Sequence, residues 1–251
     1  MQYGLYVSAA GALANSYQQD VVANNLANAE TVAFKRDLAL VRARQTQAQE
    51  NGPRQWTNDL LERLGGGVFA LPTATDFSPG SLERTGRTYD VALAGPGFFR
   101  VQLDGQVAFT RDGRLRIDEQ NRLVMQATDR PLLDVTGKAI SLDATEPFQI
   151  DERGVISQDG EIVAQLAVVD VSDTDRLRKQ GQSLYVATGA VESTPATTPT
   201  RQGMLESSGV EPVQELMNLI KAQRAFQQNL SALQIQDQTL GLAVKQVGSL
   251  G

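Results

Sequence analysis

The chain has 251 residues, of which 41% are apolar, and a formal net charge of −6. This length can bury a core in one large domain or a few small ones. The absence of cysteine and histidine excludes disulfides, thiol nucleophiles and most zinc sites. Lys and Arg are interspersed with Asp and Glu, which argues against a nucleic-acid surface, and no apolar run of about 18 residues could span a bilayer.

Residues 5–28 carry apolar side chains at spacings of three and four, which predicts an amphipathic helix within residues 1–34. Several of these side chains are small, so another helix could approach closely. The opening residues lack the positive charge of a signal peptide, and Gly4 and Gly11 interrupt their apolar run. We therefore expect mature sequence, and export by a route without a cleaved signal peptide if the protein leaves the cytoplasm.

Three asparagines, Asn24, Asn25 and Asn28, lie with Leu26 near the end of this predicted helix. Asparagine is unfavourable inside a helix because its amide competes for backbone hydrogen bonds. Amide side chains can cap carbonyls, accept left-handed geometry or bond to a neighbouring chain without desolvating a charge. The cluster therefore predicts either an interface or a local helix cap with no partner.

Residues 35–79 are predicted to be extended chain with short helices, since weak helical periodicity occurs at 38–49 and 58–64. The stretch LGGGVFALPTATDFSPGS (64–81) combines Gly, Pro and small polar residues and indicates a linker.

Residues 80–193 are predicted to form an all-β domain. Runs such as FFRVQL, QVAFT and EIVAQLAVVDV alternate or are rich in β-branched residues. Short turn pairs separate them and predict consecutive antiparallel hairpins. These pairs are Asp104-Gly105, Asp112-Gly113, Gln120-Asn121, Thr136-Gly137, Arg153-Gly154 and Asp159-Gly160.

Residues 194–208 are predicted as a second linker, because ESTPATTPTRQG supports neither a helix nor a central strand. A helix of more than thirty residues is predicted within 209–251, where Pro212 suits a first helical turn. Its apolar positions step by three and four, as in a coiled coil, in two seams that differ in phase. The seams are Val213, Leu216, Ile220 and Gln223, and then Phe226, Leu230, Leu233, Asp237, Leu240, Val244 and Val247.

Asp237 occupies a seam position where leucine is expected. An unpaired buried carboxylate costs several kcal/mol, so in an assembled state it would need a cation, a donor or water. One interpretation is a polar position that sets helix register; the other is a solvent-facing residue where the seam rotates.

Long helices are marginal in water unless their apolar stripe is buried, so the two terminal helices should pair. Each large apolar side chain contributes about 1.5 to 3 kcal/mol when fully buried, and a two-helix hairpin covers only part of them. The predicted fold is therefore mixed, mainly an all-β central domain with N- and C-terminal α-helices pairing as a coiled-coil-like layer, and the protein should assemble with other subunits. The predicted assembly interface consists of Asn24, Asn25, Leu26, Asn28, Phe34, Leu216, Ile220, Phe226, Leu230, Leu233, Asp237, Leu240 and Val244.

No stretch predicts catalysis, a cofactor or a metal. The glycines at 65–67 are not followed by the Lys-Ser/Thr of a phosphate loop, so a linker is favoured. The Asp-Gly pairs lack the ligand alternation of a calcium loop. The carboxylates Asp170, Asp173 and Asp175 lie in a polar stretch typical of a solvated loop.

Three blocks resemble the axial proteins of the bacterial flagellum, and specifically the rod proteins of the basal body. These are ANNLANAETVAFKRD (23–37), with Phe34 and Lys35; DVALAGPGFFRV (90–101) followed by FTRDGRLRID; and GMLESSGVEPVQELMNLIKAQRAFQQN (203–229). Ala33 stands where that family usually has Gly, so the turn there is expected to be less permissive or drawn into the helix. Gly209 replaces the usual Asn, and both residues accept positive φ.

The resemblance implies a structural subunit, not an enzyme, that stacks helically through its terminal helices into the hollow, torque-transmitting rod of the periplasm. It implies flagellar type III export, and partners among copies of itself, other rod proteins, surrounding ring proteins and the export apparatus. The chain is more similar to the proximal than to the distal rod component. A distal rod or hook subunit is the alternative, and a secreted oligomeric scaffold or adhesin is a further one, which would form a small closed oligomer.

Overall fold

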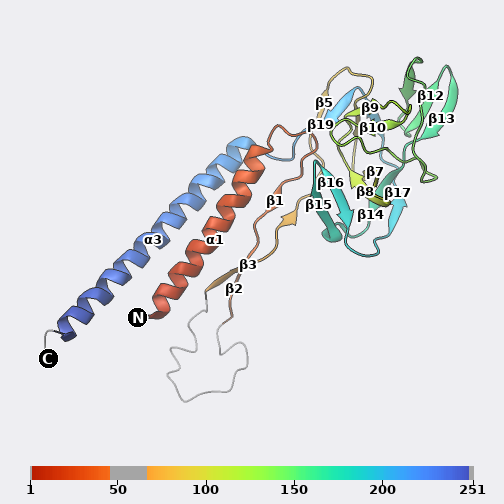
Figure 1. The fold of residues 1–251 in the computed structure, drawn as a ribbon. Coiled ribbons are helices and arrows are strands. Elements are labelled where there is room, and N and C mark those ends of the chain that lie inside the picture. Colours follow the sequence, from red (N-terminus) through yellow and green to blue (C-terminus); the bar gives the residue numbers. More distant parts are fainter. Residues whose placement is uncertain (1, 46–66, 249–251) are drawn as a thin grey trace. The chain divides into compact units, whose positions relative to one another are not determined.

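A computed structural model describes residues 2–45 and 67–248 (Figure 1). The contacts divide the chain into two compact units, each described here by itself. They are the helical unit, Met1–Ala27, Asp37–Ala74 and Glu211–Gly251, and the β unit, Asn28–Arg36 and Thr75–Val210. The predicted combination of a β-rich middle with paired helices at the two chain ends is confirmed.

The two long helices, α1 (Gln2–Ala27) and α3 (Pro212–Gly248), pack side by side and antiparallel (Figure 1). α3 has 37 residues, which confirms the predicted long C-terminal helix. Its first residue is Pro212, where the missing N–H would have no intrahelical acceptor. Among the described residues, no helix combines the length and apolar character needed to cross a membrane.

The helical unit also contains short strands where short helices were predicted. β1 (Asp37–Leu38) and β2 (Val41–Ala43) replace the described part of the helix expected at 38–49, and β3 (Val68–Ala70) pairs with β2. The antiparallel ladder satisfies backbone groups of a segment too irregular in its apolar pattern to form a stable helix. The other predicted helix, 58–64, lies outside the described residues.

The β unit is built around a six-stranded antiparallel sheet of order β15-β16-β8-β7-β14-β17. Smaller sheets pair β9 with β10, β6 with β18, and β5 with β19, and β11, β12 and β13 form a three-stranded sheet. The strand β4 (Ala74–Thr75), which pairs with β1, precedes these sheets. The strands of the β unit and its short 3₁₀ helix η1 are β5 (Leu82–Arg84), β6 (Val91–Leu93), β7 (Phe98–Leu103), β8 (Gln106–Thr110), β9 (Leu115–Ile117), β10 (Leu123–Met125), β11 (Phe148–Ile150), β12 (Val155–Gln158), β13 (Glu161–Gln165), β14 (Val168–Val171), η1 (Thr174–Arg176), β15 (Leu177–Gly181), β16 (Leu184–Ala187), β17 (Ser193–Pro195), β18 (Thr200–Gln202) and β19 (Met204–Glu206).

Most predicted turns are present. Asp104-Gly105 joins β7 to β8 and Asp159-Gly160 joins β12 to β13, each with both residues at positive φ, as hairpin turns of this type require. Turn glycines at 137 and 154 and Asn121 also have positive φ. The turn predicted at Asp112-Gly113 is wrong, because β8 and β9 do not pair with each other and Gly113 packs instead against the backbone of Val91.

The predicted second linker also differs from the structure. Residues 193–206 contribute β17, β18 and β19, which close three sheets of the β unit. β17 ends at Pro195 and lies at the edge of the six-stranded sheet, which is where a strand tolerates a missing N–H. The composition excluded a central strand but not an edge strand.

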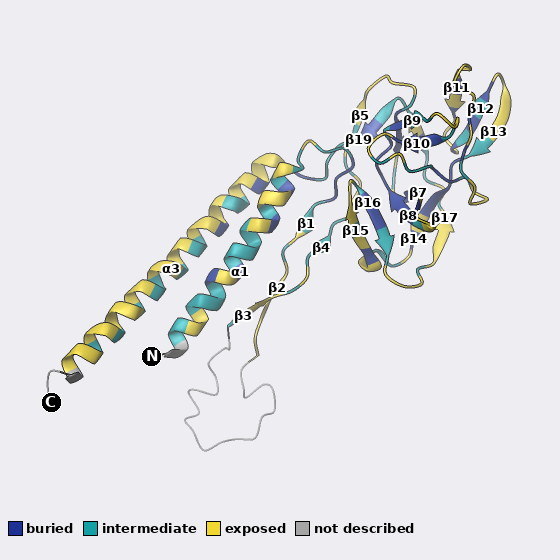
Figure 2. Cartoon of the chain, in the orientation of Figure 1, coloured by how far each residue is buried: buried dark blue, intermediate teal, exposed yellow. Residues whose placement is uncertain are grey.

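Two apolar clusters form the core of the β unit, one on each side of β7. Phe99 belongs to the larger cluster and its neighbour Phe98 to a smaller, aromatic one with Phe109 and Tyr185. Successive side chains of a strand point to opposite faces, so the alternation along β7 places one phenylalanine in each cluster. Figure 2 shows that buried residues concentrate in these strands, whereas much of α3 is exposed.

Candidate assembly surface on the terminal helices

α1 and α3 approach each other closely because α1 presents glycine at the contact. A Cβ built on Gly4 would lie 2.8 Å from Nε2 of Gln236, and one on Gly11 would lie 3.0 Å from Oδ1 of Asn229. The glycines thus make room for the amide side chains of α3. The prediction that small residues of the N-terminal helix admit a partner helix is confirmed.

The stripe of α3 that faces α1 has a seven-residue spacing but is not the predicted apolar seam. Glu215 and Ala222 are buried, and Asn229, Gln236 and Ala243 are half-buried. Small and amide residues therefore take part in the contact within the chain, although the apolar spacing did not predict them. The buried Oε1 of Gln236 has no hydrogen-bond partner among the described residues.

The predicted seam of α3 contains both half-buried and exposed residues. Phe226, Leu233 and Leu240 are half-buried. Leu216, Ile220, Leu230, Asp237 and Val244 are exposed, so Asp237 faces solvent in this chain. A repeat of three and four fits more than one face of a long helix, which is why spacing alone did not separate these two groups.

One surface of α3, which we call the outer apolar face, carries large exposed apolar side chains. Its densest part is the first two turns, where the spacing of three and four places four such side chains on one side of the helix. The face comprises Val213, Leu216, Met217, Ile220, Ile235 and Leu242. On α1, Tyr6 and Leu13 are 74% and 73% exposed and lie seven residues apart.

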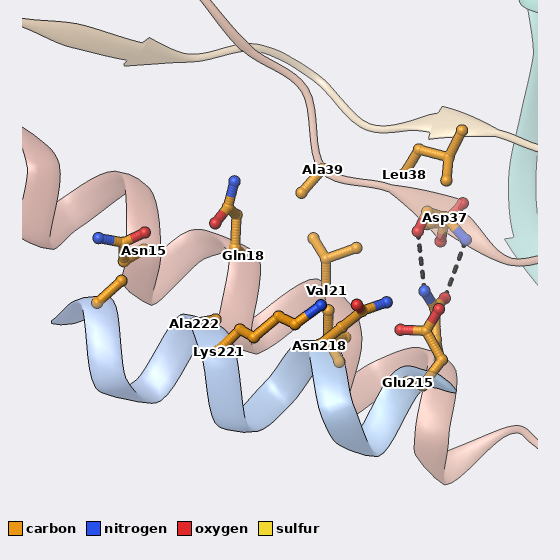
Figure 3. A pocket seen from close by; sticks show the side chains of 13 residues that line it. Asn15, Gln18, Val21, Asp37, Leu38, Ala39, Glu215, Asn218, Lys221 and Ala222 are labelled. Atoms are coloured by element: carbon orange, nitrogen blue, oxygen red, sulfur yellow. Dashed lines mark hydrogen bonds between the residues drawn. The ribbon is translucent and has the colours of Figure 1, made fainter. Parts of the chain in front are cut away.

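The asparagine cluster serves mainly the fold of the chain itself. Asn25 is buried; its Nδ2 donates to the carbonyl of Asp37 at 2.8 Å and its Oδ1 accepts from the Asp37 N–H at 2.9 Å (Figure 3). Asn28 directly follows α1, and its Oδ1 accepts from the Thr31 hydroxyl. Asn24 is exposed and Leu26 half-buried. The partner at Asp37 was missed because a backbone acceptor and donor leave no signal in the sequence.

A groove of about 420 Å³ lies between α1, α3 and the chain around Asp37 (Figure 3). Its lining mixes polar side chains, among them Gln18, Asn218 and Lys221, with apolar ones such as Val21. Within the described residues, no group of three or more His, Cys, Asp or Glu side chains could hold a metal ion.

The chain that follows α1 is buried in the β unit. Phe34 lies under the Lys179 ammonium, whose Nζ is 4.2 Å from the ring centroid, and Lys35 is fully buried. Ala33 is also fully buried, has φ of 54° and donates its N–H to the carbonyl of Glu206. The turn is thus kept, with alanine in the left-handed conformation rather than drawn into the helix. Gly209 accepts positive φ but does not adopt it here, and its N–H donates to Phe34 O.

We expect Ala33→Gly to change the free energy of unfolding by no more than about 1 kcal/mol. Glycine relieves a left-handed strain of about 1–2 kcal/mol but loses a buried methyl group and gains entropy in the unfolded chain. Ala33→Val adds a β-branch where positive φ and full burial oppose it, and should cost more than about 2 kcal/mol. Urea denaturation measures both; equal tolerance of Val and Gly would contradict the left-handed turn.

Comparison with known families covers the two chain ends and the middle. Residues 5–35 match the family described as Flagella basal body rod protein, residues 92–164 match the Flagellar hook protein FlgE/F/G D1 domain, and residues 201–245 match the Flagellar basal body rod FlgEFG protein C-terminal. The first match contains α1 from residue 5 onward, and the third contains α3 up to residue 245, each together with the segment next to the helix.

Whole-chain relatives agree. The chain is 34% identical to the flagellar basal-body rod protein FlgF of Caulobacter vibrioides, with 100% of this chain and 99% of the relative covered. It is 33% identical to FlgG of Buchnera aphidicola, with 94% and 96% covered, and 29% identical to FlgG of Bacillus subtilis, with 96% and 97% covered. The chain belongs to the family of flagellar basal-body rod proteins, which are structural and not enzymatic, and it is a subunit of the basal-body rod.

Proposed function

We propose that this rod subunit is the FlgF-type, proximal component. The observation that carries the proposal is the end-to-end match to FlgF proteins. The Caulobacter vibrioides and Mesorhizobium japonicum FlgF proteins align over 100% and 99% of this chain. The FlgG proteins of Buchnera aphidicola, Bacillus subtilis and Borreliella burgdorferi align over 94%, 96% and 97%. We expect subunits of the same type to align along their whole length, so the alignment of FlgF proteins with nearly all of this chain favours the FlgF type.

The second candidate is the FlgG-type, distal component. It is favoured by the 33% identity to FlgG of Buchnera aphidicola, which is close to the 34% identity to FlgF of Caulobacter vibrioides. Sequence identity alone therefore does not distinguish the two types. The order in which the subunits assemble can distinguish them.

We infer that the subunit polymerises through its terminal helices into the hollow shaft that transmits torque. The large side chains of the outer apolar face are exposed in the single chain, so they are available for contacts with other subunits. Their transfer from water would stabilise a contact by about 25 cal/mol for each Å² of apolar surface that becomes buried. Copies of this chain and other rod subunits are the proposed partners at this face, and ring proteins and the export apparatus are proposed as further partners.

The order of assembly tests the proximal assignment. Basal bodies purified from cells that lack this chain should contain no FlgG-type subunit, because a proximal segment must form first. Basal bodies from cells that lack the FlgG-type subunit should still contain this chain. Mass spectrometry of the two preparations gives the answer, and the reverse order would assign the chain to the distal rod.

A further inference from the structure

A cluster of three buried charged side chains lies in the β unit. Glu206 accepts from Lys35 Nζ at 2.6 Å through Oε1 and from Arg111 Nη1 at 3.2 Å through Oε2. The same Oε1 accepts from the Gly80 N–H at 2.6 Å, and Lys35 Nζ also donates to the Ser78 carbonyl at 2.7 Å. The three charged side chains are 1–2% exposed, so water does not separate them.

The cluster joins chain segments that are far apart in the sequence. Lys35 lies in the segment that follows α1, Arg111 follows β8, and Glu206 ends β19, six residues before the start of α3. Backbone hydrogen bonds reinforce the contact of the first and last segments. Ala33 N–H donates to Glu206 O, and Gly209 N–H donates to Phe34 O, both at 2.8 Å.

The charges of this cluster are not balanced by themselves, because two cations share one carboxylate. The next residue after Arg111, Asp112, is buried and pairs with Arg114 at 2.6 Å. Asp90 is fully buried as well; it forms an ion pair with Arg87, with 3.8 Å between Oδ2 and Nε, and neither of its carboxylate oxygens accepts a hydrogen bond from the described residues. The pKa of Lys35 is lowered by burial, and the Glu206 carboxylate opposes this shift.

Buried ion pairs contribute little net stability because desolvation offsets the attraction, yet the loss of one partner is strongly unfavourable. A shift of either segment would leave a buried charge without its partner, which is strongly unfavourable. The cluster therefore fixes position more than it adds stability.

We propose that Lys35, Arg111 and Glu206 are positioning residues that lock the segments 28–36 and 203–210 together and so fix the points from which α1 and α3 continue. We call this cluster the charge clasp. Rod assembly needs both helices to start from a defined place, so the clasp is required for assembly while taking no part in the contact between subunits. The proposal holds for a proximal or a distal rod subunit, and so does not depend on that assignment.

Glu206→Gln tests the clasp because it keeps the shape and removes the charge. Amide hydrogen exchange at Ala33, Gly80 and Gly209 should accelerate at least about 10-fold, since each of these N–H groups is held at the clasp. The Leu123 amide, which donates to Ile140 O in the core, should change less than about 3-fold. Swimming motility should be lost.

The matched control is Asp129→Asn, which breaks the exposed pair of Asp129 with Arg116 and should change neither exchange nor motility. If Glu206→Gln does not fold, Lys35→Met replaces it, because it leaves Arg111 and Glu206 as a balanced pair, and the same local exchange and loss of motility are expected. An equal acceleration at Leu123, unchanged exchange at the three clasp amides, normal motility, or a failure of both variants to fold would overturn the proposal.

Discussion

Ile220→Asp is expected to abolish incorporation of the chain into the rod while the isolated subunit stays folded. Ile220 is 43% exposed and lies in the densest part of the outer apolar face. A carboxylate placed in a contact between subunits must be desolvated, which costs several kcal/mol and weakens association at least about 100-fold. In the free subunit the same carboxylate reaches water.

The measurements are swimming motility and the amount of the chain in purified basal bodies, with circular dichroism of the purified variant as the test of folding. Ile220→Leu is the matched control, since it keeps an apolar side chain of the same volume and should assemble normally. Normal incorporation of Ile220→Asp would show that the outer apolar face is not a contact between subunits.

Gly113→Ala is expected to destabilise the β unit by more than about 4 kcal/mol, which is enough to prevent folding of a marginally stable domain. A Cβ at this position would lie 1.6 Å from the Val91 carbonyl oxygen and 2.7 Å from its carbon. Both are backbone atoms of a fully buried strand, so no side-chain rotation relieves the overlap. The hydrogen bond from Val91 N–H to Gly113 O would be lost as the two segments separate.

Urea denaturation and the yield of soluble protein measure this effect. Gly137→Ala is the control, because nothing lies within 4 Å of its Cβ and only its φ of +84° opposes alanine, at a cost of about 1–2 kcal/mol. Comparable losses in the two variants would mean that backbone conformation, rather than the close approach to Val91, determines the need for glycine at position 113.

The parts of the fold that could be predicted are those that depend on local patterns. The two long helices follow from apolar spacing, and the hairpin at Asp104-Gly105 follows from residues that accept positive φ in sequence. Asp112-Gly113 has the same dipeptide and a different role, because its glycine is required by a strand about twenty residues earlier in the chain. A local sequence pattern cannot distinguish a glycine needed for a turn from a glycine needed because another backbone segment lies close to it.

The parts of the site that escaped prediction depend on contacts between distant segments. Glu206 lies 171 residues from Lys35, and nothing in the sequence around either residue indicates the other. The partition of the α3 seam was also hidden, since Ala222, Asn229 and Gln236 share the seven-residue spacing of the leucines. The glycines at positions 4 and 11 of α1 let Gln236 and Asn229 approach it closely, which the apolar spacing of α3 does not indicate.

Photocrosslinking from position 220 in assembled basal bodies tests the central claim most directly. A photoreactive amino acid at this position should crosslink to a second copy or to another rod subunit, whereas one at Ile162, an exposed residue of β13, serves as the comparison site outside the helices. Crosslinks between subunits from position 220 are the predicted result. Intact rods in which position 220 gives no crosslink to any other subunit would contradict assembly through the outer apolar face.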